Sequence, residues 1–175
     1  MDIEPRLGID FGRVVHGGLR APGDDDTVFL DGSFEDAMAS PATEGVYEVL
    51  PGLIAAFEGR AWIISKCGER IQKRTLAWLD HHDFYARTDL RRENVRFCRK
   101  RADKAGHCAE LGITHMIDDR LDVHRAIRDL VPYRYLFGAE KGPEWVRLLP
   151  DWAAAEIIRA DIPAGRPRSA TRRSR

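Results

Sequence analysis

The 175-residue sequence lacks the features of membrane-spanning and disulfide-linked proteins. No apolar run approaches the roughly 18 residues of a membrane helix, so no membrane span is expected. The cysteines Cys67, Cys98 and Cys108 are odd in number and form no CxxC pair, which argues against a zinc knuckle or a disulfide framework. The N-terminal MDIEPR has no basic flank before an apolar core, so no signal peptide is predicted. These absences favour a cytoplasmic protein.

Net charge is absent too, because 28 basic residues balance 28 acidic ones. The chain as a whole therefore has no net attraction to polyanions. The basic residues of 162–175 stand without any acid or apolar periodicity, which predicts a disordered basic tail after one domain at residues 1–161. We interpret the tail as a solubilising terminus, with nucleic-acid binding as the alternative. The basic stretch 87–104 is interpreted as a solvated charged face, with attraction of a polyanionic substrate as its alternative.

Short apolar runs alternate with segments of helical spacing along the domain. Strands are expected at 6–10, 61–65, 95–98, 114–118 and 133–137. Helices are expected over 52–58, 69–79, 103–111 and 121–130, with one or two more over 143–160, broken at Pro150. Residues 16–42 are rich in Gly, Asp and Pro and predict a loop or small hairpin inserted as a flap. Strands that alternate with helices predict an α/β fold with a parallel sheet.

Polar side chains end three of the predicted strands. Asp10 ends the first, Ser65 the second and Asp118–Asp119 the fourth, while Lys104 lies in the helix before the fourth. Ligands of open parallel sheets bind outside the carboxyl ends of the strands. A lone Asp at a strand end can also only stabilise a turn, and an acid pair can cap a helix. The set in this order, however, indicates one site.

The residue types of this set suit phosphoryl transfer. A carboxylate such as Asp10 can attack phosphorus and form an aspartyl-phosphate. Mg²⁺ held by carboxylates removes the repulsion between that nucleophile and a phosphate monoester. A hydroxyl such as Ser65 and an ammonium such as Lys104 are suitable donors to the remaining phosphate oxygens.

The same residues resemble the four ordered motifs of the haloacid dehalogenase-like (HAD) hydrolase superfamily, most of which are Mg²⁺-dependent phosphatases. The motifs stand here as IDFGRV at 9–14, WIIS at 62–65, Lys104 in KAGHCAELGITH, and MIDD at 116–119. The resemblance covers roughly residues 6–138, and its last part is most similar to the 5′-nucleotidase-like branch. It implies a Rossmann-like three-layer sandwich with a central five-stranded parallel sheet.

The resemblance also implies a role for each site residue. Asp10 would be the nucleophile and a metal ligand, and Lys104 would neutralise both it and the phosphoryl group. Ser65, with Lys66 beside it, would bind the phosphorylated substrate. Asp118 would ligate Mg²⁺, directly or through water, with support from Asp119, and the main-chain carbonyl of Gly12 would complete the metal site.

Gly12 departs from the pattern of the family, whose phosphatases carry a second Asp there as general acid and base. Such help is typically worth about 10²–10⁴-fold in rate. Another group could replace it, with His16 and the acids 24–26 nearest in sequence. The substrate could have a leaving group that needs little protonation. Alternatively, the chain is a weak or inactive HAD-like module that binds phosphate compounds or a partner. A metal-independent dehalogenase-like hydrolase is less favoured, because the acid pair suggests a metal.

Intervals between the motifs are short. The family places its substrate-selecting caps after the first motif or between the second and third, and here both intervals admit little beyond core elements and the 16–42 flap. A minimal cap and an open site are expected. Such a site suits a large phosphorylated substrate, or one whose other walls come from a second subunit, so a nucleic-acid substrate and a homo-oligomer stay open.

Overall fold

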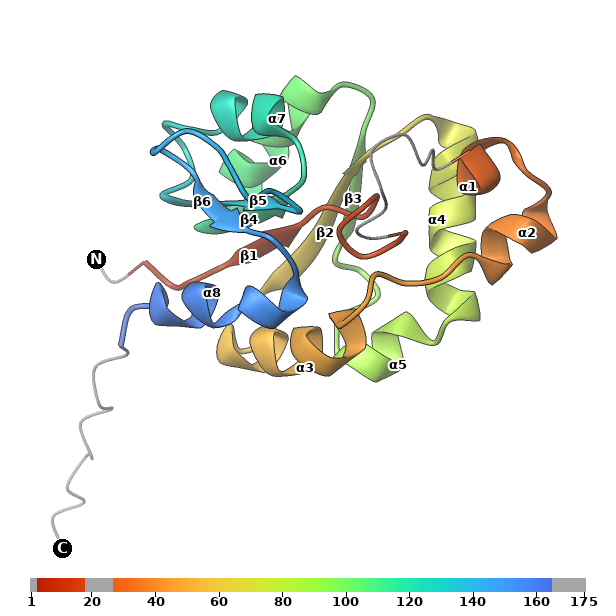
Figure 1. Ribbon diagram of the computed structural model, residues 1–175, viewed down its shortest axis with the longest axis horizontal. Coiled ribbons are helices and arrows are strands. Elements are labelled where there is room, and N and C mark those ends of the chain that lie inside the picture. The colour runs from red at the N-terminus through yellow and green to blue at the C-terminus, as the bar shows by residue number, and fades with distance from the viewer. Residues whose placement is uncertain (1–2, 18–26, 165–175) are drawn as a thin grey trace, which may run out of the picture.

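The computed structural model describes residues 3–17 and 27–164, which form a parallel sheet with helices on both faces (Figure 1). The sheet has the order β3-β2-β1-β4-β5-β6. Its strands are β1 (Leu7–Ile9), β2 (Ala61–Lys66), β3 (Val95–Cys98), β4 (His115–Asp118), β5 (Tyr133–Phe137) and β6 (Arg147–Leu149). The α-helices in the described part of the chain are α1 (Thr27–Asp31), α2 (Phe34–Ala39), α3 (Val46–Ala56), α4 (Glu69–His81), α5 (Phe84–Thr88), α6 (Lys104–Leu111), α7 (Leu121–Ala126) and α8 (Glu156–Ala160). The α/β class and the parallel sheet are confirmed.

The central strands are apolar on both sides because helices cover both faces of the sheet. Every residue of β1 is buried, as are five of the six residues of β2. Continuous apolar runs of this kind are typical of doubly covered parallel sheets. Gly8 is required at the centre, since a Cβ there would lie 2.6 Å from the sulfur of Met116 on β4. Figure 1 shows α6 and α7 on one face and α3 and α8 on the other.

The strand order reverses direction between β1 and β4. From β1 the chain adds β2 and β3 on one side, and it then returns to place β4, β5 and β6 on the other. Such a switch point opens a crevice at the carboxyl ends of its two strands. In the register of the sheet, Ile9 lies opposite Ile117, so Asp10 and Asp118 follow at the same level. The fold therefore brings two predicted site residues to the crevice.

A sixth strand corrects the sequence prediction for residues 143–160. Instead of helices throughout, the segment contains β6, which pairs in parallel with β5 through Tyr135–Arg147 and Phe137–Leu149. A short 3₁₀ helix at Trp152–Ala154 and α8 follow. The sheet thus has six strands, not five. Three residues are too few to show a strand period, so only pairing with β5 identifies β6.

The helix predictions need correction as well. α3 begins at Val46 rather than near residue 52, so Pro51 lies inside it instead of at its start. α7 ends at Ala126, short of the expected Leu130, and α5 was not predicted. Two predicted helix ends are close to the observed ones. The helix expected to end at Leu79 is α4, which ends at His81. Gly112, the expected stop of the next helix, adopts the left-handed conformation and ends α6. Boundaries set by tertiary packing were therefore the least predictable.

The predicted loop or hairpin at 16–42 contains two short helices in its described part. α1 and α2 lie beside α4, and Arg74 of α4 donates to the carbonyls of Phe29 and Gly32 at 2.8 Å. Ser33 caps α2 by accepting the Asp36 N–H at 3.0 Å. Residues 27–39 of the flap are therefore a helical segment held on α4. Residues 18–26, which include the acids 24–26, and residues 165–175 of the predicted tail lie outside the described residues.

No helix in the described ranges is long and apolar enough to cross a membrane, in agreement with the absence of a predicted span.

Candidate active site at the carboxyl edge of the sheet

Three carboxylates meet at the switch point. Asp10 follows β1, Asp118 ends β4 and Asp119 comes next in the chain. One oxygen from each of the three lies within 4.8 Å of the others. The parallel pairing of β1 with β4 produces this proximity, because it aligns the ends of strands that are more than 100 residues apart in sequence. The structure thus brings together the three acids singled out in the sequence.

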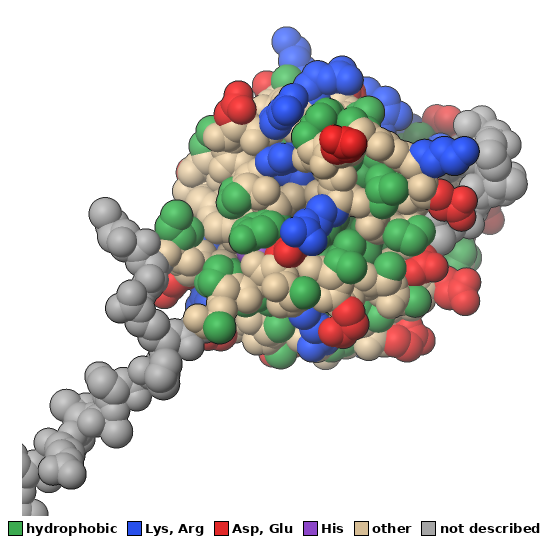
Figure 2. Space-filling model, turned by 60° about the vertical axis from the view of Figure 1, so that its left-hand side comes forward, with side chains coloured by type: hydrophobic (Ala, Val, Ile, Leu, Met, Phe, Trp, Pro, Cys, Tyr) green, Lys and Arg blue, Asp and Glu red, His purple; other side chains and the backbone are tan. Residues whose placement is uncertain are grey.

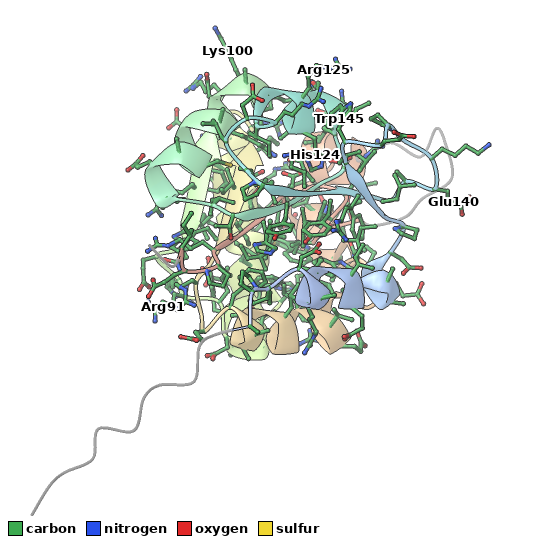
Figure 3. All side chains as sticks on the ribbon, turned by 90° about the vertical axis from the view of Figure 1, so that its left-hand side faces the viewer. Arg91, Lys100, His124, Arg125, Glu140 and Trp145 are labelled. Carbon is green, nitrogen blue, oxygen red and sulfur yellow. The ribbon has the colours of Figure 1, made fainter. Side chains whose placement is uncertain are left out.

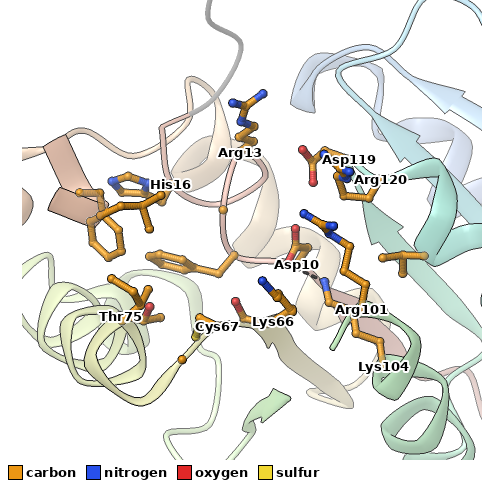
Figure 4. Close-up of a pocket in the computed structure, with 18 residues that line it drawn as sticks. Asp10, Arg13, His16, Lys66, Cys67, Thr75, Arg101, Lys104, Asp119 and Arg120 are labelled. Carbon is orange, nitrogen blue, oxygen red and sulfur yellow. Dashed lines mark hydrogen bonds and ion pairs between the residues drawn. The ribbon is translucent and has the colours of Figure 1, made fainter. Parts of the chain in front are cut away.

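Lys104 joins two of these acids. Its side chain is only 2% exposed, and Nζ lies 2.8 Å from Oδ1 of Asp10, a contact that Figure 4 shows, and 2.6 Å from Oδ2 of Asp118. A buried ammonium is tolerated only when it is well paired. Burial by itself lowers the pKa of Lys104, but the carboxylates of Asp10 and Asp118 raise it by more. The lysine therefore stays charged and holds the two acids in position.

Asp118 and Asp119 differ in their surroundings. Asp118 is fully buried, with Oδ2 bound by Lys104 and Oδ1 accepting the Arg120 N–H at 2.9 Å. Asp119 is half-buried and faces the pocket described below. Burial and the neighbouring Asp10 carboxylate raise the pKa of Asp119 to about 7, and the same two causes raise the pKa of Asp118. The side chain available to a ligand is therefore that of Asp119.

The charges of this cluster fit a divalent cation. With all three carboxylates ionised, one ammonium would leave two negative charges in a largely buried place, and burial first, then the Asp10 carboxylate, raises the pKa of Asp118 and of Asp119. Oxygen ligands of this type suit hard cations such as Mg²⁺ or Ca²⁺. A divalent cation would balance the excess without protonation of either acid. The acidic triad could therefore hold a metal ion.

The cluster forms the floor of a pocket of about 370 Å³ (Figure 4). Six of the seven predicted site residues line it, namely Asp10, Gly12, Ser65, Lys66, Lys104 and Asp119. Asp118 lies beneath the others and does not line the pocket. Predictions drawn from residues scattered over 110 positions thus converge on one cavity.

Ser65 lies at the end of β2, next to β1. The register places it one residue beyond the level of Asp10, and it is 5% exposed at the pocket wall. Lys66 follows and is exposed. Burial raises the pKa of the nearby Cys67 thiol to about 11, although a side-chain hydrogen bond with Ser65 lowers it. Cys67 is therefore protonated near neutral pH, as expected for a packed residue and not for a nucleophile.

Gly12 lies in the turn that follows Asp10. The carbonyl of Phe11 accepts the N–H groups of Val15 at 2.9 Å and His16 at 3.0 Å, which folds the turn back on itself. Among the described residues, a Cβ built on Gly12 would meet no atom within 4 Å. Packing by that part of the chain therefore does not impose glycine at this position, and it leaves space for a larger side chain.

His16, the nearest candidate for a replacement proton donor, belongs to the core. Its ring is 2% exposed and packs against Phe29 at 4.3 Å and Trp78 at 5.3 Å between centroids. Nε2 lies 2.7 Å from Oγ of Ser40, whose hydroxyl donates to the carbonyl of Ala37. Figure 4 shows His16 on the opposite side of the pocket from Asp119. These contacts favour a packing role that joins the flap to α4.

Several pocket residues were not singled out from the sequence. Arg13, Arg101 and Arg120 bring positive charge to the lining, and Phe29 and Leu30 of α1 add an apolar wall. Arg101 belongs to the basic stretch that we had interpreted as a solvated face. Arg120 directly follows the acid pair in the sequence, and this position was the one signal that could have indicated it as a site residue. The structure places both arginines at the mouth of the same cavity.

No protein-family model matches this sequence, and no curated protein matches it either. The chemistry of the cavity is therefore the basis for assigning a function.

Proposed function

We propose that this protein is a Mg²⁺-dependent phosphatase that hydrolyses a phosphomonoester through an aspartyl-phosphate on Asp10. The observation that carries the proposal is the Lys104 ammonium buried between Asp10 and Asp118 at the switch point, with Asp119 beside them. A structural ion pair needs one acid for one lysine. Here two acids bind one lysine and a third acid lies beside them at the floor of a cavity, which favours a catalytic metal site.

In the proposed reaction, a carboxylate oxygen of Asp10 attacks phosphorus. The bond from phosphorus to the leaving oxygen breaks, and that oxygen keeps the electron pair and takes a proton from solvent. Water then attacks the phosphorus of the aspartyl-phosphate, which releases inorganic phosphate, restores the Asp10 carboxylate and returns a proton to solvent. Lys104 orients Asp10 and balances its charge, and the Ser65 hydroxyl donates to a phosphoryl oxygen.

Mg²⁺ would be held by Asp10 and Asp119, with Asp118 behind them and the Gly12 carbonyl at the same cavity wall. Its chemistry there is to offset the repulsion between carboxylate and phosphate. Asp118 contributes by fixing Lys104 on one oxygen and the chain after β4 on the other.

Phosphate release is expected from an aryl phosphate such as p-nitrophenyl phosphate, with Mg²⁺ required and EDTA abolishing turnover. An aryl leaving group needs little protonation, so aryl phosphates should be hydrolysed faster than alkyl phosphates. The measurement is phosphate released from matched aryl and alkyl substrates with and without Mg²⁺. A folded, metal-loaded protein that turns over neither class would contradict the proposal and leave the alternative of a non-catalytic binding module, which the absence of an acid at Gly12 favours.

Stabilisation by Mg²⁺ is expected to grow as the pH rises from 5.5 to 7.5. Burial and the Asp10 charge raise the pKa of Asp119 to about 7, so below that pH the cation must displace a proton and its affinity falls about tenfold per pH unit. The measurement is the Mg²⁺-induced change in melting temperature at each pH.

The Mg²⁺-induced change is a difference between the melting temperatures of the metal-loaded and the metal-free protein. Effects on stability of groups that titrate far from the metal site therefore cancel. Asp119→Asn removes one of the two carboxyls whose pKa is raised, and it should reduce the pH dependence as well as weaken the Mg²⁺ effect. An unchanged Mg²⁺ effect over this range would rule out Asp119 as a ligand.

A further inference from the structure

We propose that the substrate carries a second phosphate beside the one that is hydrolysed, and that Arg101 and Arg120 bind it. This inference rests on the proposed function of the same cavity. The described lining carries five basic side chains, Arg13, Lys66, Arg101, Lys104 and Arg120, against the acids Asp10 and Asp119. Lys104 belongs to the catalytic cluster, and Lys66 is expected to act with Ser65 on the phosphate that is hydrolysed. The three arginines make the cavity more basic than the hydrolysis of one phosphate requires.

Arg101 and Arg120 are held together although they come from different elements. Arg101 begins the 3₁₀ helix Arg101–Asp103, which contacts α7, and Arg120 directly precedes α7. Both pair with Asp122, Arg101 at 3.8 Å and Arg120 at 3.4 Å. One carboxylate shared by two guanidinium groups leaves a net positive charge, and exposed ion pairs of this kind are weak. The arginines can therefore turn to a stronger anion.

A phosphate is the anion that fits this pair. A guanidinium presents parallel N–H donors that match two phosphate oxygens, and two guanidinium groups can share one phosphate. In the proposed function, the phosphate that is hydrolysed already has Ser65, Lys104 and the proposed metal site as its binding groups. Arg101 and Arg120 line the same cavity, so a second phosphate on the leaving group would be within their reach (Figure 4).

The basic character continues beyond the cavity. Arg99 and Lys100, which precede the 3₁₀ helix, and Arg125 of α7 are exposed, and Figure 2 shows Lys and Arg side chains gathered at the top of the molecule. Figure 3 places Lys100 and Arg125 there. A surface on which basic side chains predominate raises the local concentration of anionic ligands. A phosphate-rich substrate is attracted to this part of the molecule before it enters the cavity.

Two sources supply the same chemistry, a small bisphosphate and the phosphorylated end of an oligonucleotide. The test measures dissociation constants by calorimetry with full-length Asp10→Asn protein and Mg²⁺, so that ligands are not consumed. The probes are adenosine 5′-monophosphate, adenosine 3′,5′-bisphosphate and a 5′-phosphorylated trinucleotide. We expect the compounds with a second phosphate to bind on the order of tenfold tighter than the monophosphate, with an advantage that shrinks in high salt.

Arg101→Gln and Arg120→Gln should each remove most of this advantage while the affinity for the monophosphate stays the same. Both side chains are exposed, so the fold should be retained, and Arg91→Gln is a matched control away from the cavity. Tighter binding of the trinucleotide identifies a nucleic-acid end, and tighter binding of the bisphosphate identifies a small molecule. Equal binding of all three probes, or equal loss for all three in the variants, would overturn the inference.

The outcome is separable from that of the proposed function. Preference for a second phosphate in Asp10→Asn, without phosphate release by the unaltered protein, would retain the binding site and refute the phosphatase. Release of phosphate by the unaltered protein, without a preference for a second phosphate, would support the phosphatase and refute the second phosphate site.

Discussion

Asp10→Asn is expected to reduce phosphate release by about 10⁴-fold or more, because a carboxamide cannot attack phosphorus and no other pocket carboxylate is placed at the end of β1. The substitution keeps the size of the side chain and removes one negative charge from a cluster of three. Lys104 keeps its second partner, Asp118, at 2.6 Å. The fold should therefore survive, and the melting temperature should be unchanged or higher.

The measurement is kcat/KM for an aryl phosphate together with the melting temperature of each variant. Asp129→Asn, at an exposed position outside the pocket lining, is the matched control and should keep full activity. If Asp10→Asn retains more than a small fraction of the activity, Asp10 is not the nucleophile. If it loses activity only because it unfolds, the melting temperature will reveal it, and Asp10→Ser provides a second variant without the carboxylate.

Gly12→Asp is expected to increase hydrolysis of alkyl phosphates by about 10²–10⁴-fold, the typical contribution of a general acid. The described residues leave space for the new side chain, since none of their atoms lies within 4 Å of a Cβ at this position, and Gly12 already lines the cavity. Aryl phosphates should gain much less, because their leaving groups depart without protonation. The ratio of alkyl to aryl turnover is therefore the measurement.

Gly12→Asn is the matched control, since it adds a side chain of the same size that cannot supply a proton. Equal gains from Asn and Asp would show that the effect is steric. No change in the ratio with Asp would show that proton transfer to the leaving group does not limit the rate. Absence of turnover even in Gly12→Asp would instead favour the alternative of a phosphate-binding module.

Most of the sheet was predictable because apolar runs are a local signal. The runs at 61–65 and 133–137 became β2 and β5 almost unchanged, since each is long enough to show an apolar run, with five buried residues in β2 and three in β5. The three residues of β6 carry no such signal and form a strand only through pairing with β5. Likewise α1 and α2 depend on packing against α4, which no local pattern in 16–42 reveals.

Within the site, sequence alone determined which residues carry the chemistry. Acids, a hydroxyl and a lysine at the ends of apolar runs are recognisable from order, because parallel strands deliver their carboxyl ends to one edge. That inference placed Asp10, Ser65 and Lys104 in one group, and all of them line one cavity.

Only the tertiary structure decided how these groups relate to one another. The contact of Lys104 with Asp10 spans 94 positions of sequence and depends on strand order and register. The same geometry buries Asp118 and leaves Asp119 facing the cavity, packs His16 among aromatic rings, and brings Arg101 to Arg120. Residue type is a local property, whereas distance, burial and charge balance arise from segments that meet only when the chain has folded.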